Sequence, residues 1–259
     1  MLRNIIGKIF GFSSDINHLE NTIKILENEI SEMDKLIDNL NKDIKTLKIE
    51  LKEKETRLEE YLNNKRPKIN KLYIRHETDD TYYIDIRDFY QIYDSNLPKV
   101  SGTTYDEIAY NCLMWVQDNI KYISDKKEYG YNEYWAYSYQ TLKNRVGDCD
   151  DGSILLANML LANGIPYYRV RLNAGTVKGG GHCYVSYCRE YDNQFVVLDW
   201  CFYPNKLEIR NRKKHSEERN YINKERNYMV WFSWNLKYIF GTVKDPKKLD
   251  DKYSIEVSK

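Results

Sequence analysis

The sequence predicts an α+β globular domain, in which a central helix packs on an antiparallel sheet, preceded by a long N-terminal helix. Three observations lead to this prediction. Apolar residues follow a heptad pattern near the start of the chain, a helix-ending stretch follows at residues 63–67, and the remainder mixes short strand-like segments with two helical ones. With 42% hydrophobic and 14% aromatic residues among 259, the chain can bury at least one substantial core.

Charge and composition exclude several classes of function. The 40 Lys and Arg residues against 39 Asp and Glu leave a net charge of +1, which gives no support for a nucleic-acid partner. The apolar runs are far shorter than the roughly 20 residues that cross a bilayer, and the N-terminus lacks the apolar stretch of a secretory signal. Five cysteines without a Cys-x-x-Cys pair argue against a disulfide framework or a thiolate zinc site. We therefore expect free thiols in a cytoplasmic or particle-associated protein.

The N-terminal helix is expected to form a coiled coil over residues 15–66, after a short docking segment at residues 1–14. The seam residues recur at spacings of three and four: Ile16, Leu19, Ile23, Leu26, Ile30, Met33, Ile37, Leu40, Ile44, Leu47 and Leu51. Residues 15–64 contain no Pro or Gly, which predicts a rod on the order of 70 Å long. Ile at the a positions with Leu at d favours a parallel homodimer. A trimer, or a coil with helices of another protein, stays open because the flanking charges do not decide orientation.

The globular domain is expected over residues 67–259. Residues 106–122 and 149–163 read as helices, and the second is apolar nearly all round with Gly164 just after it, which predicts a buried central helix. Strand-like segments lie at residues 82–86, 167–172, 183–188, 194–200 and 228–234. Residues 204–227 carry charges of both signs and few apolar groups, so we expect an exposed connection there.

Cys149 lies where the predicted central helix begins. A thiol at this position meets backbone N–H groups and the positive end of the helix dipole, which favours the thiolate and supplies a donor for an oxyanion. The alternative interpretation is a buried structural cysteine beside the acidic residues that helix N-termini prefer.

His182 and Asp199 complete a candidate catalytic group. His182 opens one predicted strand and Asp199 ends the next. If residues 189–193 form the hairpin turn, residues 182 and 199 face each other to within about one residue. A carboxylate after a buried strand is costly unless it is paired, so we expect it to hydrogen bond the imidazole. The set of Cys149, His182 and Asp199 then offers a nucleophile, a base and an orienting acid.

Several motifs in order resemble the transglutaminase-like superfamily, and most closely its bacterial cysteine-peptidase branch. The resemblance covers roughly residues 105–202 and is carried by Trp135, Gln140-Thr141-Leu142, Gly147-Asp148-Cys149-Asp150-Asp151, Gly181-His182 and Leu198-Asp199. It implies a papain-like or transglutaminase-like core with Cys149 as nucleophile, His182 as base and Asp199 as the residue that orients it. It also implies acyl transfer from a protein or peptide amide through a Cys149 thioester, with hydrolysis favoured over cross-linking.

The second oxyanion donor and a metal are the remaining site predictions. Trp135, which the resemblance suggests, and Gln140 both carry suitable N–H donors, although either side chain could equally pack in the core. The triad requires no cofactor. The resemblance admits calcium at Asp148 and Asp150, but calcium takes about six to eight oxygen ligands, so we expect helix N-terminal acids and no metal.

A non-catalytic role is the alternative from a different class. A long oligomerising helix joined to this fold also suits a structural or binding component of a larger assembly, such as a virion, because fold alone does not determine function. A third hypothesis is that residues 1–64 dock an enzyme onto a scaffold.

Overall fold

The computed structural model describes residues 2–64, 68–69, 71–77, 81–178, 180–215, 228–241 and 253–256. The chain divides into two compact units, Met1–Glu60 and Tyr61–Lys259. No helix in the described ranges is both long enough and apolar enough to span a bilayer.

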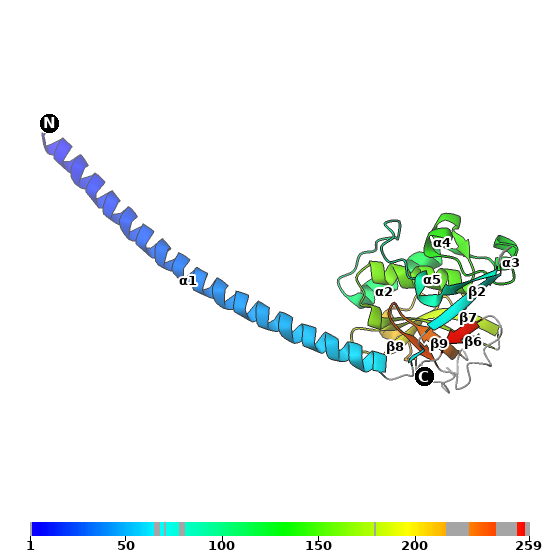
Figure 1. Cartoon of the computed structure of the whole chain (residues 1–259). Coiled ribbons are helices and arrows are strands. Elements are labelled where there is room, and N and C mark those ends of the chain that lie inside the picture. Colours follow the sequence, from blue (N-terminus) through cyan, green and yellow to red (C-terminus); the bar gives the residue numbers. More distant parts are fainter. Residues whose placement is uncertain are drawn as a thin grey trace. The chain divides into compact units, whose positions relative to one another are not determined.

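The first unit is a single helix, which forms most of α1 (Leu2–Asn64), drawn from blue to cyan in Figure 1. The helix begins at Leu2, so residues 2–14 continue it rather than forming a separate local structure. The eleven predicted seam residues are exposed by 49% to 63%. A lone helix therefore leaves its apolar stripe in water, and pairing of that stripe in a coiled coil stays a prediction.

The second unit is built on a six-stranded antiparallel sheet with the order β1-β10-β9-β6-β7-β8. Its strands are β1 (Lys68–Ile69), β6 (Val170–Val177), β7 (Gly180–Cys188), β8 (Phe195–Leu198), β9 (Met229–Trp234) and β10 (Ile239–Gly241). Nearly all residues of β6 are buried, because the strand lies in the middle of the sheet. The strongly apolar segments of the sequence thus form the sheet centre.

Helix α5 (Cys149–Ala162) is the central helix that the sequence predicts. It packs on β6 and β7, and α2 (Tyr105–Asn119) and α4 (Ser138–Asn144) cover it in turn, on the same face of the sheet (Figure 1). Residues 150–160 are all buried, which explains why the helix is apolar nearly all round. Gly164 adopts a φ of 92° and ends the helix, as its position after the last turn predicts. The predicted α+β architecture is confirmed.

Smaller elements complete the globular unit. A second sheet has the order β11-β2-β3, and a two-residue parallel pair joins β4 to β5. These and the short helical pieces are β2 (Lys71–Glu77), β3 (Thr81–Asp85), β4 (Lys121–Tyr122), β5 (Val146–Gly147), β11 (Tyr253–Glu256), α3 (Asp125–Glu128), η1 (Ile86–Phe89), η2 (Tyr167–Arg169) and η3 (Ile209–Asn211). The β4–β5 pair holds Tyr122 opposite Gly147, two residues before Cys149.

The first half of the expected exposed connection, residues 204–215, is largely exposed, with three exceptions. Ile209, Arg212 and His215 are buried. The Arg212 guanidinium donates from its two terminal nitrogens to the carbonyl oxygens of Val197 and Asn205, which compensates part of the cost of burying a charged side chain. The second half, residues 216–227, lies outside the described residues.

Candidate active site

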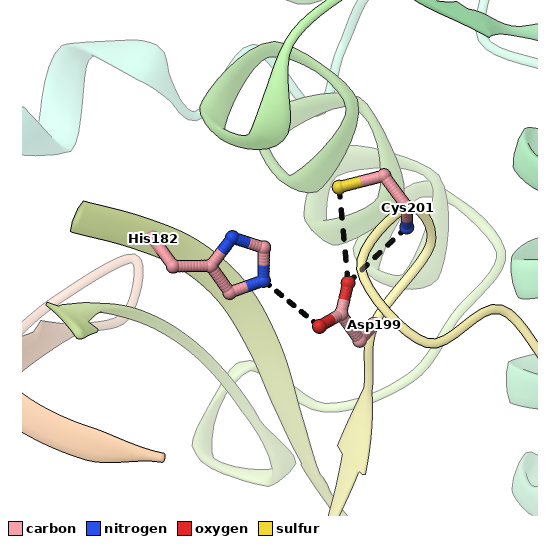
Figure 2. A group of neighbouring side chains, drawn as sticks. All are labelled: His182, Asp199 and Cys201. Carbon is pink, nitrogen blue, oxygen red and sulfur yellow. Dashed lines mark hydrogen bonds and ion pairs between the residues drawn. The ribbon is translucent and has the colours of Figure 1, made fainter. Parts of the chain in front are cut away.

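His182 and Asp199 form a buried hydrogen-bonded pair. The distance from His182 Nε2 to Asp199 Oδ2 is 2.8 Å, and the two residues are 8% and 1% exposed. Figure 2 shows His182 on its strand and Asp199 just beyond the end of the neighbouring strand, with the second ring nitrogen, Nδ1, directed away from the carboxylate. The pair thus leaves one imidazole nitrogen for a second partner.

The strand register behind this pair differs from the predicted one. Strands β7 and β8 pair from Val185↔Leu198 to Cys188↔Phe195, which puts residue 199 opposite residue 184 rather than 182. The predicted register is wrong by two residues because the loop spans residues 190–193, closed by a hydrogen bond from Arg189 N to Gln194 O. A shift of two keeps a side chain on the same face, so His182 and Asp199 meet as diagonal neighbours.

The Asp199 carboxylate receives hydrogen bonds on both oxygens. Oδ2 accepts from the Tyr228 hydroxyl as well as from His182, and Oδ1 accepts from the backbone N–H groups of Cys201 and Phe202, each at 3.1 Å. Burial raises the pKa of Asp199, but the hydrogen bond and charge of His182, together with the bonds from Tyr228 and Phe202, bring it below its ordinary value. Asp199 is therefore ionised at neutral pH and can orient the imidazole.

Cys149 is the first residue of α5, and the segment that follows Asp199 holds this helix end in place. The Trp200 indole N–H donates to the Cys149 carbonyl oxygen at 3.3 Å. Gly152 lies directly under the same indole, where any side chain would collide with the ring. The close contact requires a glycine, and it ties the start of α5 to the end of β8. The nucleophile candidate and the His182–Asp199 pair are thus carried by elements in contact.

The Cys149 thiol is partly exposed and lies 3.8 Å from Asp150 Oδ1. Burial raises the pKa of Cys149 well above that of a free thiol, the Asp148 charge raises it further, and the backbone N–H of Cys183 acts in the opposite direction. The resting group is a thiol, unlike the thiolate expected from the helix dipole, because burial outweighs the dipole. The hydrogen bonds found among the described residues include none between Cys149 and His182.

Both side chains predicted to supply an oxyanion donor have other partners. The Trp135 indole N–H donates to Glu133 Oε1 at 3.0 Å, and Trp135 is 2% exposed. The Gln140 side chain accepts from Tyr137 N at 2.8 Å and donates to the Tyr134 hydroxyl at 3.1 Å, which caps helix α4. Either donor would have to change partner to serve an oxyanion at Cys149.

Sequence analysis did not single out Tyr122, which lies beside the thiol. Its ring centroid is 6.2 Å from that of Trp200, and its side chain is half exposed. Burial raises the pKa of Tyr122, and the charges of Cys149 and Asp148 raise it further, so the phenol is protonated and able to donate. No sequence signal marks this residue, because a two-residue parallel pair such as β4–β5 has no periodicity to detect.

The acidic residues around Cys149 offer more candidate metal ligands than Asp148 and Asp150, the two that the sequence indicates. Asp148 groups with Cys149 and Asp150, and separately with Asp125 and Asp151, with donor atoms within 4.8 Å of one another in each group. Within the described part of the chain, the buried oxygens Asp125 Oδ1 and Asp150 Oδ2 have no hydrogen-bond partner. Burial raises the pKa of Asp125 to about 8, and Asp148 adds to the shift. Buried carboxylate oxygens without donors fit a hard divalent cation such as calcium.

Comparisons with known proteins place the globular unit in a family. LapG of Legionella pneumophila is 17% identical with a TM-score of 0.42, over 56% of this chain and 74% of its own. Its calcium-bound form is 16% identical with a TM-score of 0.40, over 51% and 66%. A Cytophaga hutchinsonii protein described as a candidate cysteine protease is 14% identical with a TM-score of 0.33, over 66% and 45%. No curated protein matches significantly. The family described as transglutaminase-like domain matches residues 90–228, more than half of the chain, and on that match the chain belongs to the transglutaminase-like family.

Proposed function

We propose that this chain is a cysteine peptidase-like enzyme that cleaves a peptide or isopeptide amide through a Cys149 thioester. The observation that carries the proposal is the buried His182–Asp199 pair. Its carboxylate holds Nε2 and leaves Nδ1 as a base, on the strand against which the Cys149 helix packs.

In the proposed reaction the thiol first leaves Asp150, from which it lies 3.8 Å away, and gives its proton to His182 Nδ1. The sulfur then attacks the amide carbonyl carbon, and the oxyanion accepts hydrogen bonds from the Cys149 backbone N–H and the Tyr122 hydroxyl. Collapse breaks the C–N bond, and the amine leaves with the proton from His182. Water then loses a proton to His182 and attacks the thioester, which releases the acid and restores the thiol.

Asp125, Asp148, Asp150 and Asp151, called here the acid cluster, form two groups that share Asp148, and the carboxylates of either group would hold a calcium ion. The ion would supply positive charge beside Cys149. That charge would offset the effect of Asp148, which raises the pKa of the thiol, and so favour the thiolate. The proton transfers above depend on the protein residues alone.

Selective alkylation tests the proposal without knowledge of the substrate. Each cysteine's reaction with limiting iodoacetamide is followed by peptide mass at several pH values, in the wild type and in His182→Ala. The other four cysteines, Cys112, Cys183, Cys188 and Cys201, serve as the comparison within the same protein. We expect Cys149 to react ahead of them because it can pass its proton to His182, and to lose that lead in His182→Ala. A Cys149 that reacts no faster than the other four in the folded protein would overturn the proposal.

A peptide library with an added amine then separates the two chemistries. Hydrolysis gives products that carry water, and cross-linking gives amine adducts, because both resolve the same thioester. We favour hydrolysis. Cys149→Ala should abolish either product, and activity retained in that variant would rule out the thioester.

We further propose that α1 forms a parallel homodimer through the seam residues, since each is about half exposed on a lone helix. Light scattering of the full chain tests this. If α1 instead pairs with helices of another protein, the purified chain would be a monomer and would form a complex in its native setting. A fixed number of copies in a native particle, such as a virion, together with an unreactive Cys149, would favour the structural role and a particle-associated location over a cytoplasmic enzyme.

A further inference from the structure

Tyr228 reaches the His182–Asp199 pair from a distant part of the chain. It directly precedes β9 and is fully buried. Its hydroxyl donates to Asp199 Oδ2, the oxygen that also accepts from His182 Nε2. Its ring centroid lies 6.2 Å from that of the imidazole. One carboxylate oxygen is therefore shared between the catalytic imidazole and a phenol from another strand.

A neighbouring tyrosine shows that this contact is specific. The Tyr184 ring lies 4.7 Å from that of Tyr228 and 6.0 Å from the imidazole. Its hydroxyl, however, is 3.1 Å from His215 Nε2 and hydrogen bonds there. Two buried phenols thus lie side by side behind His182, and the hydroxyl of Tyr228 is the one bonded to Asp199.

The contact orients the carboxylate. The backbone N–H groups of Cys201 and Phe202 hold Oδ1, and Figure 2 shows the Cys201 bond on the side of Asp199 away from the imidazole. Without the Tyr228 hydroxyl, the bond from His182 is the one that Oδ2 would keep among the described residues. Hydrogen bonds to an ionised acceptor are directional and stronger than neutral ones, so the phenol restricts rotation of the carboxylate.

We propose that Tyr228 is a positioning residue, which holds the Asp199 carboxylate so that His182 presents Nδ1 to Cys149. The inference rests on the proposed function of Cys149. Its effect passes through Asp199, to which its hydroxyl donates.

The titratable groups that face Asp199 are His182 from β7, Tyr228 before β9 and Cys201 after β8, with the Cys183 thiol of β7 also within range of its charge. Burial raises the pKa of Asp199, and His182, Tyr228 and the Phe202 N–H lower it. Removal of the phenol hydroxyl therefore raises the folded-state pKa. As pH falls, the ionised pair should be lost earlier in the variant than in the wild type.

The test uses Tyr228→Phe in the full chain, with Tyr187→Phe as the matched control. Tyr187 is also fully buried, and its hydroxyl donates to a carboxylate, Asp106 Oδ1 at 2.7 Å, away from His182. The readout is the rate of Cys149 alkylation from about pH 3 to about pH 9, which includes the range where Asp199 titrates, with thermal unfolding measured in parallel. We expect Tyr228→Phe to slow Cys149 about tenfold and to move the acid limb up by about one pH unit. Tyr187→Phe should lower only the melting temperature.

A second variant covers the case in which Tyr228→Phe fails to fold. 3-Fluorotyrosine placed at position 228 by nonsense suppression keeps the ring and makes the hydroxyl a stronger donor. It should move the acid limb in the opposite direction, to lower pH. The positioning role would be overturned if the acid limb of the Cys149 alkylation profile stayed in place in both variants. If wild-type Cys149 still reacted fast and depended on His182, the proposed function would remain.

A spectroscopic readout tests the positioning role of Tyr228 independently of the proposed function of Cys149. The His182 Nε2–H signal, assigned in proton–nitrogen spectra by its loss in His182→Gln, reports the hydrogen bond to Asp199 whether or not Cys149 reacts. We expect it to shift in Tyr228→Phe and to stay in place in Tyr187→Phe. If wild-type Cys149 proves unreactive, the proposed function fails; a shifted signal then still supports the orienting contact, and an unshifted one overturns it.

Discussion

The helical unit and the globular unit differ in which residues they expose to water and which they bury. In α1 the apolar seam is exposed, with Leu47 63% accessible, and the charged residues surround it in water. In the globular unit several acidic residues are buried, with Asp199 1% exposed and Asp151 fully buried. The helix therefore depends on a partner for burial of its apolar stripe, whereas in the globular unit the buried Asp199 depends on the hydrogen bonds that both of its oxygens accept. The same type of substitution should have different effects in the two units.

The largest expected contrast is between two carboxylate removals. Asp199→Ala leaves His182, the Tyr228 hydroxyl and two backbone N–H groups without their acceptor, and should lower the free energy of unfolding by about 3–5 kcal/mol. Glu53→Ala breaks a 3.9 Å pair with Arg57 between exposed side chains and should change it by less than about 0.5 kcal/mol. Urea denaturation measures both, and similar losses would contradict the contrast.

Calcium and pH should change the stability of the fold through the buried acids and not through the exposed ones. Because the folded-state pKa of Asp125 is raised to about 8, its ionisation destabilises the fold as pH rises from about 4 to 8. Calcium at a hundredfold excess over its dissociation constant should restore about 2.7 kcal/mol near pH 8 and less at lower pH, where Asp125 is protonated. Thermal unfolding with calcium or a chelator measures this. Asp125→Asn should weaken the response and Asp43→Asn, on α1, should not; an unchanged response in Asp125→Asn would remove this residue from the acid cluster's ligands.

Glycine to alanine should have opposite signs in the two units. At Gly152 the added methyl group meets the Trp200 indole, which should lower stability by about 1–3 kcal/mol and loosen the start of α5. At Gly11, on α1, nothing lies within 4 Å, so alanine should stabilise the helix by about 1 kcal/mol. Circular dichroism melting curves give both values. A neutral Gly152→Ala would mean that the indole can move aside.

Removal of residues 1–60 should have the smallest effect on the globular unit. Light scattering should show loss of the oligomer, while the melting temperature and the Cys149 alkylation rate stay unchanged. The boundary matters, because Leu62 and Asn63 are buried and the Leu62 carbonyl accepts a hydrogen bond from Arg171. Removal of residues 1–64 should therefore destabilise the fold, and an equal stability of the two truncations would contradict this assignment.

The elements that the sequence predicted well are those defined by neighbours along the chain. The N-terminal helix, the start of the central helix at Cys149 and its end before Gly164 follow from periodicity, capping and backbone conformation, which act over a few residues. The contact between His182 and Asp199 was also predicted, although the predicted strand register was wrong by two residues. The contact needed only that both side chains lie on the same face of the sheet and near the same end of their strands.

Contacts between distant segments were decided by the tertiary structure alone. The Trp200 indole donates to the Cys149 carbonyl oxygen, Arg212 donates to the Val197 carbonyl oxygen, and Tyr228 bonds a carboxylate 29 residues earlier. The sequence by itself determined which residue types could do chemistry and on which elements they lie. Which donor meets which acceptor depends on loop conformation and on packing between elements far apart in the chain, and the energies of those choices are not encoded in any local pattern.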